Sequence, residues 1–203
     1  MQQIVLLDNV TPQPWRNGGG QTRELLVWPG GGPAGGDWRL RISLADIQND
    51  GPFSAFPGIT RWFTVVQGQG VELRFGSRTV TLGAGSDPVQ FDGAAAPGCR
   101  LIDGPTRDLN LMVRDGEGAM LPVRSGQTWD GGGFAQRGLF TAAAGTLRCE
   151  RGATTPLPAN ALLWQSDAAA DALRFEPEDE PASGYAAWWL GYSPKDQSRA
   201  VRK

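Results

Sequence analysis

Arg61 is the side chain in this sequence that is best suited to hold an anion. It opens an alternating segment, Arg61–Gln67, which we expect to be a strand. A guanidinium group can bind a carboxylate through two parallel hydrogen bonds. The alternative is a surface arginine paired with an acidic residue at a strand end. We favour the inward orientation, which would require a partner because an unpaired inward charge is costly.

Asn17 is a second candidate, because it precedes the three glycines Gly18, Gly19 and Gly20. A glycine-rich loop can direct several backbone N–H groups, including that of Gly18, toward an anion. The asparagine side chain would add one donor and one acceptor. The same composition also fits a simple turn, so both interpretations stay open.

Asp108 and Asn110 lie two residues apart on the expected strand Asp108–Arg114 and share a face with Met112. A face of this composition suits a polar patch at the mouth of a pocket. Asp108 could instead form a structural ion pair with Arg107 or Arg61. The two interpretations are compatible, since a ligand carboxylate could replace Asp108 on Arg61.

Arg41 and Ser43 share one face of the expected strand Trp38–Ala45. If that face is inward, they add a second cation and a hydroxyl group to the site. The opposite face is apolar, which favours an outward Arg41 unless the strand lies between two packed layers. Further candidates are the polar residues Thr22 and Glu24 and, as aromatic walls for a planar ligand, Trp15, Phe53, Phe56 and Trp62.

The chain contains no histidine among its 203 residues. This excludes Ser-His-Asp and Cys-His catalysis and the histidine-ligated zinc, iron and copper sites. Cys99 and Cys149 form neither a disulfide framework nor a zinc signature, so we expect two reduced thiols. A carboxylate-only Mg²⁺ or Ca²⁺ site would need an acidic cluster that the sequence lacks. We therefore predict no metal, no cofactor and no catalytic residue.

The formal net charge is −2, and no basic stripe is present that would follow a phosphate backbone. We therefore expect no nucleic-acid partner. No apolar run approaches membrane-spanning length, and the N-terminal segment has Asp8 inside its only apolar stretch, unlike a secretory signal. We expect a cytoplasmic protein without membrane contact. The sequence leaves the oligomeric state open and is compatible with a homodimer.

Short alternating segments separated by Gly- and Pro-rich turns run along the whole chain, and no helical period is sustained. This pattern predicts an all-β protein of antiparallel sandwich or barrel type, jelly-roll-like. We expect an exposed, mobile loop at Pro29–Gly36 and a frayed tail from about residue 194. The other expected strands are Ile4–Leu7, Thr22–Trp28, Val71–Phe75, Arg78–Leu82, Val89–Phe91, Arg100–Ile102, Gly138–Ala143, Gly145–Arg151, Ala161–Trp164 and Ala186–Tyr192.

Two segments resemble cupin motifs that have kept their glycines and lost their metal ligands. The first motif, G-x5-H-x-H-x3-4-E-x6-G, keeps its final spacing between Arg61 and Gly68, with arginine in place of glutamate. The second, G-x5-P-x-G-x2-H-x3-N, keeps Gly85 and Gly93 and has Ala96 at the ligand position. The resemblance implies a cupin barrel in which a site for a cation has become a site for an anion.

Four runs together resemble the HutD/Ves family of small bicupins: PWRNGGGQTRE, WRLRISLADI, DGPFSAFPGITR and RDLNLM. The resemblance implies an N-terminal cupin barrel with a ligand pocket over 1–118, a second, degenerate barrel over 119–193 and a flexible tail over 194–203. It further implies a regulatory or accessory protein of histidine utilisation that binds urocanate or a related degradation intermediate.

Two other functions stay open. The first is a metal-free enzyme acting on a small carboxylic acid, with Asp108 or Glu24 in acid–base roles and Arg61 as the electrophile. The second is a protein-interaction module with a vestigial pocket. We favour the binding protein, because the sequence shows no pair of carboxylates whose different environments would separate their pKa values for acid–base catalysis.

Overall fold

The computed structural model describes residues 1–29, 37–166, 171–179, 181 and 184–195, and it consists of antiparallel strands in four sheets. The six-stranded sheet has the order β2 (Gln13–Pro14), β3 (Gly20–Trp28), β4 (Leu40–Ile47), β11 (Thr106–Arg114), β6 (Ile59–Gln67) and β9 (Val89–Asp92). The four-stranded sheet has the order β5 (Gly51–Pro52), β10 (Gly98–Leu101), β7 (Val71–Phe75) and β8 (Arg78–Leu82).

The C-terminal part adds two more sheets. The five-stranded sheet has the order β1 (Gln2–Leu6), β16 (Ala161–Gln165), β13 (Gln136–Thr141), β18 (Ala187–Pro194) and β12 (Gly116–Pro122). The three-stranded sheet has the order β15 (Thr154–Leu157), β14 (Gly145–Cys149) and β17 (Leu173–Pro177). Two single-turn 3-10 helices, Leu7–Asn9 and Gly93–Ala95, interrupt the strands.

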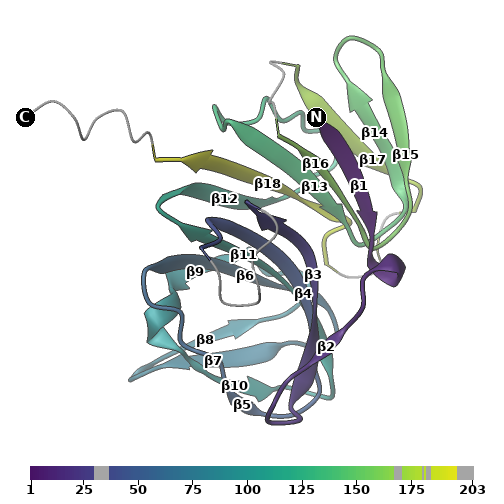
Figure 1. Ribbon diagram of the computed structural model, residues 1–203. Coiled ribbons are helices and arrows are strands. Elements are labelled where there is room, and N and C mark those ends of the chain that lie inside the picture. Colours follow the sequence, from purple (N-terminus) through teal and green to yellow (C-terminus); the bar gives the residue numbers. More distant parts are fainter. Residues whose placement is uncertain (30–36, 167–170, 180, 182–183, 196–203) are drawn as a thin grey trace, which may run out of the picture.

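The four sheets pack as successive layers, which form two sandwiches that lie against each other (Figure 1). One apolar cluster lies between the four- and six-stranded sheets and includes Phe63, Val65 and Leu73. The largest cluster joins the six- and five-stranded sheets. A third lies between the five- and three-stranded sheets. The six-stranded sheet is therefore covered on both faces.

This double cover explains the composition of strand β4. Leu40, Ile42 and Leu44 pack into the cluster shared with the five-stranded sheet. The alternate residues, which include Arg41 and Ser43, face the interior of the first sandwich. Both faces are consequently buried, yet only one of them is apolar throughout. The polar face of this sheet is the part of the fold that positions a site.

The structure confirms the all-β, antiparallel prediction and the bounds of β7 and β8. Five strands were not predicted: β2, β5, β12, β15 and β17. In the described pairing each sheet is open, so closed barrels stay a prediction. The expected boundary after residue 118 falls within β12, and β1 pairs with β16 of the C-terminal part. The division into two barrels thus also stays a prediction.

The expected mobile loop and tail fall almost wholly on 30–36 and 196–203, which lie outside the described residues. Pro194, the first residue of the expected tail, is the last residue of β18. Among the described helices, neither is long and apolar enough to cross a bilayer.

Candidate functional site

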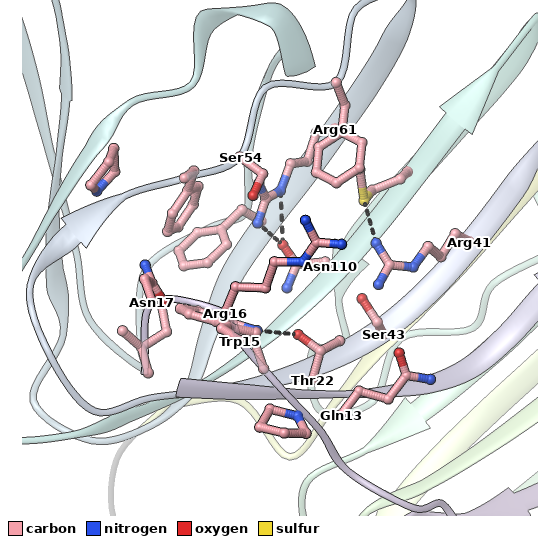
Figure 2. A pocket seen from close by; sticks show the side chains of 18 residues that line it. Gln13, Trp15, Arg16, Asn17, Thr22, Arg41, Ser43, Ser54, Arg61 and Asn110 are labelled. Atoms are coloured by element: carbon pink, nitrogen blue, oxygen red, sulfur yellow. Dashed lines mark hydrogen bonds between the residues drawn. The ribbon is translucent and has the colours of Figure 1, made fainter. Parts of the chain in front are cut away.

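A cavity of about 460 Å³ opens between the six-stranded sheet and the loops that lead to the four-stranded sheet (Figure 2). Residues from β3, β4, β6 and β11 form its floor, and the loop after β2 and the segment after β5 form its rim. Its lining residues are Gln13, Pro14, Trp15, Arg16, Asn17, Thr22, Arg41, Ser43, Ala45, Ile47, Pro52, Phe53, Ser54, Phe56, Arg61, Phe63, Asn110 and Met112.

Arg61 lies on the floor of the cavity, and only 9% of its surface is exposed. Its Nε and Nη2 both donate to Asn110 Oδ1, at 2.9 and 2.5 Å. The two side chains meet because β6 and β11 are paired, with Arg61 opposite Met112 and Phe63 opposite Asn110. The guanidinium therefore has a neutral amide as its hydrogen-bond partner.

Aromatic rings surround the same guanidinium. Its Cζ lies 4.3 Å from the ring centre of Phe53, 5.6 Å from that of Phe91 and 5.8 Å from that of Phe63. These rings favour a cation electrostatically but offer no hydrogen-bond acceptor. Within the described residues, no carboxylate forms an ion pair with Arg61. The side chain thus keeps donors and charge for a further anionic partner.

Burial and, to a smaller extent, the nearby Arg41 lower the pKa of Arg61 to about 9, while Asp108 opposes the change. A guanidinium remains protonated at neutral pH even with this shift. The cavity floor accordingly carries a permanent, poorly hydrated positive charge. Such a charge attracts a carboxylate more strongly than an exposed arginine does.

Asp108 does not occupy the predicted position at the mouth of the pocket. Its side chain is fully buried in the first sandwich and does not line the cavity, and its Oδ2 accepts a hydrogen bond of 2.8 Å from Thr106 Oγ1. Its Oδ1 has no hydrogen-bond partner among the described residues. The predicted ion pairs of Asp108 with Arg61 or Arg107 are also not formed, because Arg107 pairs with Asp46 and Arg61 bonds to Asn110.

Desolvation by burial raises the pKa of Asp108 to about 8, against smaller opposing effects of Thr106 and Arg61. The ordinary pKa is 3.8, so between these values the folded protein retains a proton that the unfolded chain releases. The stability that this group contributes is complete below pH 4 and is lost as the pH rises through 8.

An Asp108→Asn variant, which cannot titrate here, should therefore gain stability over the wild type as the pH rises. We expect the difference in free energy of unfolding to grow by up to about 1.4 kcal/mol per pH unit between pH 5 and 8. Urea unfolding of both proteins at pH 5, 6, 7 and 8 measures this difference. A difference that does not change with pH would contradict a raised pKa.

Arg41 and Ser43 both line the cavity. This is the inward orientation that we expected if their strand lies between two packed layers. Arg41 Nε lies 2.7 Å from Glu24 Oε1, and its Nη1 contacts Met112 Sδ at 3.7 Å. The charge of Arg41 is thus largely neutralised by Glu24. Ser43 is 2% exposed and forms no side-chain hydrogen bond within the described part of the chain, so its hydroxyl is available to a ligand.

Asn17 lies at the rim, in the loop that joins β2 to β3. Its Oδ1 accepts a hydrogen bond of 3.0 Å from the backbone N–H of Gly19, which leaves the amide nitrogen as the group available to a ligand. Gly18, at a φ of +68°, shapes this turn but is not among the lining residues. Its predicted direct contact with a ligand therefore has no support in the geometry.

Three of the four aromatic residues predicted for the site lie at the cavity, and their contact with a planar ligand stays a prediction. Trp15, Phe53 and Phe56 line the cavity, and Trp15 Nε1 donates to Thr22 Oγ1 at 2.8 Å, which fixes the ring at the rim. Trp62 instead packs into the cluster between the two sandwiches. Its side chain must face away from the cavity because its neighbour Arg61 faces into it.

Sequence reasoning did not single out Arg16 or Phe63, both of which line the cavity. Period-two alternation from an inward Arg61 could have identified Phe63. Arg16 has no such signal, because it lies in a loop. No group of three or more His, Cys, Asp or Glu in the described residues is arranged to hold a metal ion.

A family model described as HutD matches residues 7–182 of the chain. The chain is 39% identical over 114 residues to an uncharacterised 21.2 kDa protein in the hutC 3' region of Pseudomonas putida. The aligned region covers 55% of this chain and 59% of the relative. It is also 39% identical over 102 residues to protein Ves of Citrobacter koseri. This aligned region covers 49% of this chain and 51% of that relative. These matches thus span little more than half of the curated relatives.

A solved structure of HutD from Pseudomonas fluorescens SBW25, in a formate condition, has a TM-score of 0.73 to this chain. The sequences are 24% identical, and the similarity covers 95% of this chain and 98% of that chain. At this identity the likeness concerns the fold alone. Similar solved structures are cupin-like, which confirms that part of the predicted fold class.

Proposed function

Because the chain belongs to the HutD family, as the resemblance of its motifs implied, we propose that it is a metal-free binding protein for a small carboxylate metabolite. The metabolite would be urocanate or a related intermediate of histidine degradation. The protein would serve as a regulatory or accessory component of histidine utilisation. The naming of one relative after the hutC 3' region supports this association.

The observation that carries the proposal is the state of Arg61. It is a buried cation on the floor of a cavity, it is held by one neutral acceptor, and it lacks a carboxylate partner among the described residues. A carboxylate could approach this guanidinium and accept hydrogen bonds from it. Ser43 and the amide nitrogen of Asn17 would orient the rest of the ligand, Asn110 would hold the guanidinium in place, and Phe53 and Phe56 would flank a planar group.

The geometry gives less support to an enzyme. Glu24 is held by Arg41, and Asp108 is fully buried and does not line the cavity. Neither carboxylate is positioned to exchange a proton with a molecule bound above Arg61, which general acid–base catalysis would require. A binding role, in contrast, needs no proton exchange and requires only the groups that already line the cavity.

Titration calorimetry with urocanate, formate, glutamate and formylglutamate tests the proposal. We expect at least one acid to bind with a Kd in the micromolar to millimolar range, equivalent to about 4–8 kcal/mol. An Arg61→Ala variant should bind that acid much more weakly. The proposal fails if none of the four binds below several millimolar, or if the variant binds as well as the wild type.

A further inference from the structure

The cavity holds more positive charge than one carboxylate would neutralise. Three of its lining residues, Arg16, Arg41 and Arg61, carry guanidinium groups, and no lining residue is acidic. Glu24 pairs with Arg41. Within the described residues, neither Arg16 nor Arg61 has an ion-pair partner. Two uncompensated positive charges therefore remain, one on the floor and one at the rim.

Arg16 belongs to the rim loop between β2 and β3, and its exposed side chain lines the cavity. Figure 2 shows it extending across the cavity that it lines, with the guanidinium on the side where Asn110, Arg61 and Arg41 lie. Its loop is fixed by hydrogen bonds from Trp15 N to Gly20 O and from Trp15 Nε1 to Thr22. An extended cation that faces other cations is favoured when an anion lies between them.

Apart from the three arginines, more of the cavity-lining residues are apolar than polar. Phe53, Phe63, Met112 and Ile47 contribute carbon or sulfur surface to the lining, and Ser43 adds a hydroxyl. A ligand that suits this arrangement has an anionic group at each end and a short, mostly apolar connection. A ligand with one anionic end would leave Arg16 unmatched.

We propose that the cavity selects dicarboxylates over monocarboxylates, with Arg61 binding the inner carboxylate and Arg16 binding the outer one. This inference rests on the proposed function, because the inner contact is the one proposed above. Arg16 is then the specificity-determining residue of the site. Urocanate, with one carboxylate, would bind through Arg61 alone.

Calorimetry at low salt with two matched series of acids tests this inference. One series is malonate, succinate, glutarate and adipate, and the other is the monocarboxylates of equal carbon number. At the best-fitting length we expect the dicarboxylate to bind about three- to tenfold more tightly, since Arg16 is exposed and its ion pair is partly screened. Arg16→Gln should remove this preference, because it should weaken dicarboxylate binding much more than monocarboxylate binding.

Two control variants separate the outcomes. Arg78→Gln removes a positive charge from an exposed position on β8, outside the cavity, and should keep the preference for dicarboxylates. Arg61→Gln should weaken both series. Equal affinity for the two series in the wild type, or equal weakening of both by Arg16→Gln, would overturn the inference and leave the proposed function intact. If none of the four acids named above binds the wild type below several millimolar, the proposed function itself fails.

Discussion

Replacing Arg61 with methionine should abolish carboxylate binding and, at the same time, make the protein more stable. The two effects have one cause. A desolvated guanidinium with one neutral acceptor is held in an aromatic setting that would accept an apolar side chain of similar length. Removing this buried charge removes a desolvation cost of several kcal/mol, which outweighs the about 1–3 kcal/mol lost when Asn110 Oδ1 is left without its donors.

The expected loss of affinity for the tightest-binding acid is at least about 100-fold, because the variant lacks the charge and the guanidinium N–H donors that Asn110 does not occupy. Calorimetry measures the affinity, and urea unfolding measures the stability. A structural role for Arg61 predicts the opposite result for stability, namely a marked loss. An Arg61→Met protein that is destabilised and still binds the acid would contradict the account.

Changing Asn110 to aspartate should also eliminate binding, but through competition within the protein. The new carboxylate would have the shape of the amide whose Oδ1 already accepts both hydrogen bonds from Arg61. It would pair with the guanidinium and repel an incoming anion. We expect affinity to fall by at least about 30-fold, since a fully formed ion pair must be broken for the ligand to bind.

Asn110→Ser provides the matched control, because it removes the internal acceptor without adding charge. The serine variant should be less stable than the wild type, since Arg61 loses its buried hydrogen-bond partner. Its affinity for the acid should be equal to or higher than that of the wild type, because the ligand then supplies the missing acceptor. Similar losses of affinity in both variants would show that Asn110 acts by shape and not by charge.

The sequence predicted much of the first sandwich, because its strands alternate regularly and are bounded by glycine turns. It also identified Arg61, Asn110, Ser43 and Asn17, which the structure brings to one cavity. These residues could be found because period-two alternation assigns residues of one strand to a common face.

The sequence could not show which strands pair or how deep a side chain lies. Asp108 and Asn110 share a face, yet only Asn110 reaches the cavity, because Asp108 is covered by the packing of the first sandwich. The inward orientation of Arg41 depended on a second sandwich behind β4, which no local pattern reveals. Arg16 lies in a loop, where neither alternation nor composition indicates direction.

The most direct test of the account is a crystal structure of the protein with the acid that binds most tightly in calorimetry. The account predicts a carboxylate with both oxygens within about 3 Å of the Arg61 guanidinium nitrogens, the distance of a charge-assisted hydrogen bond. Asn110 should remain in contact with the same guanidinium. A ligand bound elsewhere, or one seated in this cavity with its carboxylate directed away from Arg61, would contradict the central claim.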